Sequence, residues 1–189
     1  MKKTRCDWVL DDPISINYHD EEWGNLNRFE DDHYLFEMLT LEGAQAGLNW
    51  HTILRRREHY RTAFDYFDPE IVVYYNENKI EQLLNNPHII RNRRKIESTI
   101  KNARAFLHVQ KEFGSFHTFL WEFVGKKQVV NRWKSSDEVP ASSPLSEKLS
   151  KELKRRGFSF VGPVICYAYL QAIGLINDHI EHCFLHLNK

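Results

Sequence analysis

The sequence predicts an all-α protein in which residues 1–189 form one domain of two helical lobes sharing a core. Residues 31–45 place apolar side chains at helical spacing, and residues 89–113 form a long basic segment with an apolar stripe. The pairs Asp68-Pro69 and Ser143-Pro144 match a helix start, in which a capping residue precedes proline. A length of 189 residues suits a single ordinary domain.

Capping residues and breaks divide the first half of the chain. The helix over residues 31–45 begins with Asp31 and Asp32, whose charges suit the positive end of a helix dipole. Asn49 can cap a second helix that runs to about residue 64. One short helix is expected from Asp68-Pro69 through Tyr75, and another around Leu83. The pair Asn86-Pro87 then breaks the chain.

The second half is expected to contain helices around one irregular segment. Residues 126–143 lack regular periodicity and are interpreted as an extended loop. The helices on either side, in order, cover residues 89–113, 115–125, 144–157 and 163–174, followed by a last short helix capped by Asn177 or Asp178.

Composition indicates a globular protein, which we expect in the cytoplasm. Hydrophobic residues make up 42% and charged residues 28%, values that exclude a wholly disordered chain. No apolar run approaches the roughly 20 residues that span a bilayer, so no membrane partner is expected. The first residues lack the apolar segment of a secretory signal. In a reducing compartment, three cysteines are not expected to form disulfides.

Charge is balanced in total but uneven along the chain. The sequence has 26 basic and 26 acidic residues, yet residues 7–50 contain eleven acidic residues and only Arg28 as a basic one. The basic residues cluster at 55–57, 91–95 and 148–156. Solvated helix faces are the simplest interpretation of these clusters. One basic face can still bind DNA phosphates, because binding responds to local potential.

Cysteine and histidine residues near the two chain ends suggest a metal site. His179 and Cys183 are spaced to share one helix face, and Cys6 and His19 lie near the amino end. Two cysteines and two histidines are the ligand set of a closed structural zinc site. The alternatives are a buried free cysteine with surface histidines, or His182 or His186 in place of His179. Cys166 lies in an apolar helix and is interpreted as core.

Aromatic residues also gather around one carboxylate in the sequence. Trp8, Tyr18 and Trp23 surround an acidic segment, while Glu42 follows an apolar helical stripe and Trp50 comes shortly after it. A carboxylate between indole and phenol rings suits a planar cation, which the rings stack on and the carboxylate neutralises. From composition alone, core tryptophans and a surface glutamate explain the same pattern.

Several motifs together resemble the DNA-3-methyladenine glycosylase type I (Tag) family, part of the helix-hairpin-helix glycosylase superfamily. They run in order from Cys6 to Cys183 with no large gap. Residues 25–33 and the loop over 126–140 match poorly. The matching motifs are Cys-x-Trp-Val, Tyr-His-Asp-x-Glu-Trp-Gly, Leu-Phe-Glu-Met, Leu-Glu-Gly-x-Gln-Ala-Gly-Leu-x-Trp, Ile-Ile-Arg-x-Arg-x-Lys-Ile, Arg-Gly-Phe-x-Phe-Val-Gly and Asn-Asp-His.

The resemblance implies a DNA repair enzyme that flips out 3-methyladenine and hydrolyses its bond to the sugar. It implies that Glu42 is the catalytic carboxylate and that the extruded base is bound by Trp8, Tyr18, Trp23 and Trp50. It further implies one structural Zn²⁺ that joins segments 1–24 and 174–189, held by Cys6, His19, His179 and Cys183.

The resemblance also implies how DNA is held. Gly47 and Leu48 fall where the family inserts a wedge into the base stack, and Gly157 and Gly162 bound the hairpin that binds phosphate. Asp178 lies near the position of the superfamily's catalytic aspartate, but is interpreted as a helix cap. The expected partner is alkylated double-stranded DNA, with a monomeric protein, no organic cofactor and a place at the nucleoid.

Three other functions would fit parts of the same sequence pattern. A non-catalytic binder of damaged DNA would have nearly the same sequence. A zinc hydrolase would need an open metal position, which two cysteines and two histidines do not leave. A purely structural helical protein would not need Glu42 beside so many aromatic residues.

Overall fold

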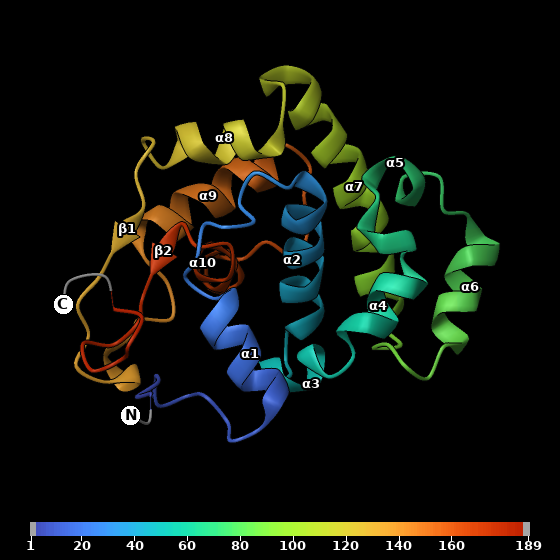
Figure 1. Ribbon diagram of the computed structural model, residues 1–189. Coiled ribbons are helices and arrows are strands. Elements are labelled where there is room, and N and C mark those ends of the chain that lie inside the picture. The colour runs from blue at the N-terminus through green and yellow to red at the C-terminus, as the bar shows by residue number, and fades with distance from the viewer. Residues whose placement is uncertain (1–2, 187–189) are drawn as a thin grey trace.

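The computed structural model describes residues 3–186, and these are mostly helical, as the sequence predicts. Two very short strands and two 3-10 turns complete the described chain (Figure 1). The elements in order are α1 (Pro13–Glu21), α2 (Asp32–Gln45), α3 (Trp50–Leu54), α4 (Arg57–Ala63), η1 (Asp65–Phe67), α5 (Pro69–Val72), α6 (Glu77–Asn85), α7 (Arg93–Phe113), α8 (Phe116–Phe123), β1 (Val129–Val130), η2 (Ser136–Glu138), α9 (Pro144–Arg155), α10 (Pro163–Ala172) and β2 (Ile176–Asn177).

Side-chain caps explain most helix starts. The carboxylate of Asp68 accepts a hydrogen bond from the backbone of Glu70 at the start of α5, and Ser143 and Ser146 form a reciprocal capping box at α9. Both starts were predicted. Helix α1 was not predicted, although Asp12 precedes a proline just as Asp68 does, and its side chain caps the helix by accepting from the amides of Ile14 and Ser15.

Two predicted helices differ from the observed ones in their extent. The helix expected from Asn49 to residue 64 is broken after α3, and the turn directs Arg57 into the interior. The long helix begins at Arg93 rather than at residue 89, because the side chain of Asn92 caps it by accepting from the amide of Lys95. The backbone before it is extended, and the amide of Ile90 donates to the hydroxyl of Tyr60.

The prediction of a last short helix capped by Asn177 or Asp178 is wrong. Asn177 belongs to β2, which pairs in parallel with β1 so that Val129 lies opposite Ile176. The segment expected to be an irregular loop therefore supplies a strand that holds the C-terminal residues extended. Asp178 does not cap a helix, because its two carboxylate oxygens are occupied by side-chain donors.

Helices α2 and α10 form the centre of the molecule and lie side by side (Figure 1). Two buried phenols fasten them: Tyr34 of α2 donates to the carbonyl of Ala172, and Tyr169 of α10 donates to the carbonyl of Leu35. Helices α4 to α6 lie on one side with α7, while β1, β2 and both chain ends lie on the other side (Figure 1). The centre thereby places Glu42, near the end of α2, against α10 and the N-terminal segment.

A buried ion-pair network ties α1, α2 and α4 together. Arg57 is only 7% exposed, and its guanidinium group lies 2.6 Å from Glu37 of α2 and 2.8 Å from Glu22, just after α1. Arg61 also pairs with Glu37. The basic cluster at 55–57 is therefore not entirely a solvated face, and removing Arg57 would leave buried carboxylates unpaired.

The two chain ends meet on one side of the molecule (Figure 1). The amide of Phe184 donates to the carbonyl of Thr4 over 2.9 Å, and residues of both ends are buried together there. Within residues 3–186, no helix combines the length and the apolar character needed to cross a bilayer.

Gly174 is the glycine at which the fold should tolerate a side chain least. Its φ is +81°, and a Cβ atom there would lie 2.3 Å from the backbone of Asn25. Gly114, whose φ is +84°, has open space around it and is the matched control. We expect Gly114→Ala to lower the free energy of unfolding by about 1–2 kcal/mol, and Gly174→Ala by a further ~1–3 kcal/mol, because the backbone of Asn25 must move. Equal losses in urea unfolding would contradict this packing.

Candidate functional site

A cavity of about 640 Å³ opens between the N-terminal segment, the end of α2, α3, α10 and the loop over residues 126–143. The five residues expected to bind the base or act in catalysis all line this one cavity. Its walls are formed by Trp8, Leu10, Ser15, Tyr18, Trp23, Glu42, Gln45, Asn49, Trp50, His51, Leu54, Ser136, Val139, Ala168, Gln171 and Asp178.

The aromatic walls are packed against one another. The ring centroids of Trp8 and Trp23 lie 5.0 Å apart in an edge-to-face pair, and those of Tyr18 and Trp50 lie 5.4 Å apart. Trp8 also lies 6.3 Å from Tyr18, so the four rings form one continuous set. Such pairs fix ring orientations and keep rigid apolar faces toward the cavity.

Glu42 is a buried acidic residue of this wall that has no hydrogen-bond partner in the described chain. It is 4% exposed, and no group of residues 3–186 donates a hydrogen bond to its carboxyl oxygens. Removal from water raises the pKa of Glu42 to about 8. The neighbouring phenol of Tyr18 has a pKa well above its ordinary value, because of burial and then the charge of Glu42. Without a cationic ligand, Glu42 is therefore mostly protonated at neutral pH.

Hydrogen-bond donors without partners also lie in the cavity wall. The indole Nε1 atoms of Trp8 and Trp50 and the hydroxyl of Ser136 are buried and make no hydrogen bond within the described chain. Buried polar groups of this kind favour a ligand that can pair with them. The cavity thus combines apolar ring faces, unpaired donors and the unpaired carboxyl group of Glu42.

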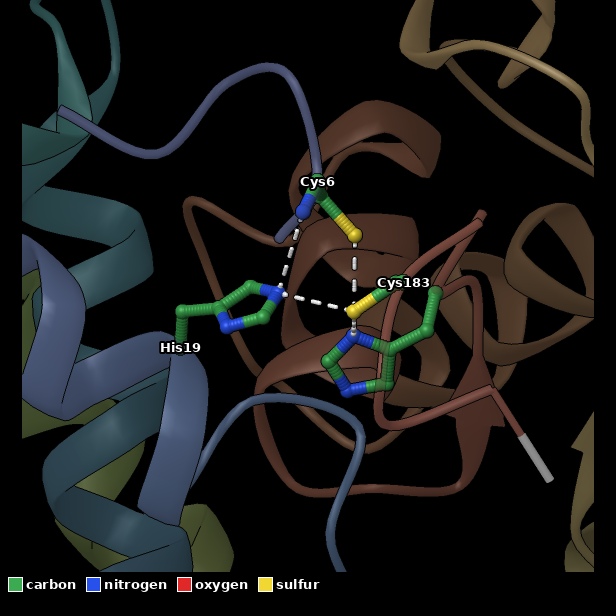
Figure 2. Close-up of side chains that lie close together, drawn as sticks. Cys6, His19 and Cys183 are labelled. Carbon is green, nitrogen blue, oxygen red and sulfur yellow. Dashed lines mark hydrogen bonds between the residues drawn. The ribbon is translucent and has the colours of Figure 1, made fainter. Parts of the chain in front are cut away.

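The four predicted metal ligands converge into one buried cluster. The Sγ atom of Cys183 lies 3.5 Å from both His19 Nε2 and His179 Nδ1, and Cys6 Sγ lies 3.6 Å from His179 Nδ1. Figure 2 shows the side chains of Cys6, His19 and Cys183 pointing toward one another. In tetrahedral zinc sites, neighbouring sulfur and nitrogen ligands are about 3.6 Å apart, so these distances fit such an ion.

The outer nitrogen of each histidine is already bonded. His19 Nδ1 lies 2.8 Å from the carboxylate of Asp20, and His179 Nε2 lies 3.0 Å from the carbonyl of Trp23. These acceptors orient both rings so that the inner nitrogen presents its lone pair to the cluster, as in the outer shell of metal sites. The guanidinium of Arg5 donates two hydrogen bonds to the carboxylate of Asp20 and lowers the pKa of that carboxyl to about 2.

The structure also separates the four clustered residues from the alternative histidines. Nδ1 of His186 donates to the backbone carbonyl of His179 at 2.8 Å, and His182 is exposed. Neither belongs to the cluster. His179 and Cys183 come together through a turn rather than on a helix face, so the expected helical geometry is wrong although the pairing is right. Cys166 is buried in the core, as predicted.

The expected wedge lies at the turn between α2 and α3. Gly47 has a φ of +78°, and Leu48 is 42% exposed next to the cavity residue Asn49. Lys95 donates to the carbonyls of Ala44 and Ala46 and so holds this turn. Lys95 belongs to the basic cluster at 91–95, and its ammonium group is bound within the protein.

The expected hairpin is the turn between α9 and α10. Gly157 has a φ of +94°, and Gly162 is the residue that precedes α10. The amide of Ser159 is taken by the side chain of Asn102, so it is not free for a phosphate. A Cβ atom added at Gly43 would lie 3.5 Å from the Cβ atom of Phe160, so the hairpin lies close to α2 at the residue after Glu42.

Sequence reasoning missed several cavity residues. Ser136 and Val139 come from the loop that matches the family poorly, and Gln171 lies on α10, which appears in the sequence as plain core. Asp178 was assigned to a helix cap. Its place in the wall depends on β1 and β2, for which two-residue strands leave no periodic signal.

Comparison with known proteins agrees with this geometry. A model of the methyladenine glycosylase family matches residues 8–186. The chain is 47% identical over 179 residues to DNA-3-methyladenine glycosylase 1 of Escherichia coli K12, covering 95% of each chain. A crystal structure of 3-methyladenine DNA glycosylase I, 49% identical, aligns with a TM-score of 0.92 over 97% of this chain and 100% of that one.

A second solved structure contains a ligand. It is a tyrosine-to-phenylalanine variant of 3-methyladenine DNA glycosylase I in complex with 3-methyladenine, 35% identical, with a TM-score of 0.90 over 95% of both chains. The family model and the sequence relative each cover nearly the whole chain. The chain therefore belongs to the methyladenine glycosylase family.

Proposed function

We propose that this protein is a DNA repair glycosylase that hydrolyses the bond between 3-methyladenine and deoxyribose in alkylated double-stranded DNA. One observation carries the proposal: Glu42 is buried without a protein partner inside a cavity walled by four aromatic rings. A planar cation is the ligand that such a cavity stabilises most, since the rings stack on it and the carboxylate neutralises it.

The chemistry of the lesion matches this cavity. Methylation at N3 makes adenine cationic and weakens its glycosidic bond, so the departing base needs no proton. Flipping the nucleotide out costs a few kcal/mol, and each aromatic contact with a desolvated cation returns about 0.5–2 kcal/mol. Bound beside Glu42, the cation favours the ionised carboxylate and displaces its proton. Water then adds to C1′ of the sugar and loses a proton to solvent, while the bonding electrons leave with the base as neutral 3-methyladenine.

We infer that DNA is held at the cavity mouth by Leu48 and by the hairpin over residues 157–162. An exposed leucine on a left-handed glycine turn can fill the gap left by a flipped nucleotide. Among the hairpin amides, those of residues 160–162 donate to no group in the described chain, which leaves them available for a phosphate.

We also propose that Cys6, His19, His179 and Cys183 hold one structural Zn²⁺ per chain. The distances, the burial and the oriented histidines support the assignment. Four protein ligands close the coordination shell, so the ion supplies folding energy and no catalytic water.

Identification of the released bases is the experiment that tests the activity. We expect release of 3-methyladenine from methylated DNA and no release of hypoxanthine or uracil, because a neutral base has neither the charge that favours ionised Glu42 nor the weakened glycosidic bond of the methylated base. Glu42→Gln keeps the shape of the cavity but removes its charge, and should slow release roughly 10- to 100-fold. Binding to methylated DNA without base release would instead identify a damage binder, and efficient release of uracil would overturn the proposed selectivity.

Metal content tests the zinc assignment. Purified protein should contain one zinc per chain, and Cys183→Ala should lose it along with several kcal/mol of unfolding free energy. Cys166→Ala removes an equally buried thiol outside the cluster and should retain the metal. Folded wild-type protein without metal by elemental analysis would refute the assignment.

The wedge is tested by separating duplex distortion from base recognition. Leu48→Ala should slow excision from duplex DNA roughly tenfold while leaving the affinity for free 3-methyladenine unchanged. Ile71→Ala is the control, because Ile71 is similarly exposed at 48% but lies on α5, outside the cavity wall. If Leu48→Ala weakened both measurements equally, Leu48 would be part of the base pocket rather than a wedge.

A further inference from the structure

Asp178 is a buried carboxylate that accepts four side-chain hydrogen bonds. Its Oδ1 atom accepts from Asn131 at 2.7 Å and from Trp133 at 2.8 Å. Its Oδ2 atom accepts from the hydroxyl of Tyr167 at 2.6 Å and from Nε2 of Gln171 at 2.7 Å. The residue is fully buried and lines the cavity. With both oxygens occupied, Asp178 is suited to orienting its neighbours rather than to reacting with a sugar.

The orientation of the Gln171 amide follows from this contact. A carboxylate can only accept hydrogen bonds, so Gln171 must turn its NH₂ group toward Asp178. Its carbonyl oxygen Oε1 then points away from Asp178, and it accepts no hydrogen bond from the described residues. Because Gln171 is a wall residue, the cavity is the environment left for this oxygen.

We propose that Gln171 determines base specificity by accepting a hydrogen bond from the exocyclic amine of the flipped methyladenine, and that Asp178 is its positioning residue. The inference rests on the proposed glycosylase function. Trp8 and Trp50 offer only indole donors to the cavity, which cannot pair with an amine. Gln171 supplies a neutral acceptor in addition to Glu42, and its orientation is fixed before the base arrives.

The consequence is discrimination between two cationic bases of similar shape. Adenine carries an amine at C6, whereas guanine carries a carbonyl oxygen there. A fixed Oε1 atom would pair with the amine and repel the oxygen, and a buried polar group left unpaired is what makes such sites selective. Aromatic stacking and the charge of Glu42 do not distinguish 3-methyladenine from 3-methylguanine, because both bases are planar cations in DNA.

The ratio of 3-methyladenine to 3-methylguanine released from the same methylated DNA tests this inference. Gln171→Met keeps the length of the side chain without its acceptor, and should lower the ratio roughly tenfold. Asp178→Asn can offer its own NH₂ group to Gln171, so the Gln171 amide is free to turn, and the ratio should fall in the same direction. Gln128→Met is the matched control, since Gln128 donates to the carbonyls of Gly24 and Gly174 and does not line the base cavity.

A second measurement separates recognition from folding. Affinity for free 3-methyladenine, followed by tryptophan fluorescence, should fall roughly tenfold in Gln171→Met and stay unchanged in Gln128→Met. The inference is overturned if Gln171→Met releases the two bases at an unchanged ratio and retains its affinity for the free base. It is also overturned if both losses only follow the fraction of folded protein. In either case the proposed function stands. A wild-type protein that binds the free base but releases none would overturn the proposed function alone.

Discussion

The structure around the cavity depends on shielding the carboxyl group of Glu42 from solvent without giving it a hydrogen-bond partner in the protein. Glu42 is 4% exposed and its pKa is raised to about 8, so the protein bears the cost of a buried acid whose charged form nothing in the described chain stabilises. A salt bridge to Glu42 would remove that cost, but it would also remove the preference for a cationic ligand. The unfavourable environment of Glu42 is thus the basis of the selectivity that we propose.

Such a site requires rigid surroundings, because a flexible wall would let water or a neighbouring cation reach the carboxyl group. Three buried polar assemblies supply the rigidity. Arg57 fixes α1 against α2 and α4, the cysteine and histidine cluster joins the chain ends, and Asp178 fixes α10 against the loop after β1. The cysteine and histidine cluster matters most for the aromatic wall, because Trp8, Tyr18 and Trp23 all lie on the N-terminal segment that it holds.

The sequence was informative wherever local signals decide structure. Helical spacing and caps such as Ser143 predicted most helices, because the contacts involved span only a few residues. The last helix was predicted wrongly, since Asn177 is held extended by β1, almost 50 residues away. Family motifs located Glu42 and the cysteine and histidine cluster, whereas spacing alone left several alternatives open. Gln171 and Asp178 carried no such signal, because their importance comes from side chains that meet only in the folded chain.

Proton release on binding tests the central claim about Glu42 most directly. The ligand is 3,9-dimethyladeninium, in which a methyl group stands in place of the sugar and the positive charge cannot be lost. Calorimetric titration at pH 7 in buffers of different ionisation enthalpy counts the protons exchanged. With the pKa of Glu42 at about 8 in the empty cavity, the wild type should release close to one proton per ligand, and Glu42→Gln should release none. Binding without proton release in the wild type would show that Glu42 is already ionised, or that it does not face the bound cation.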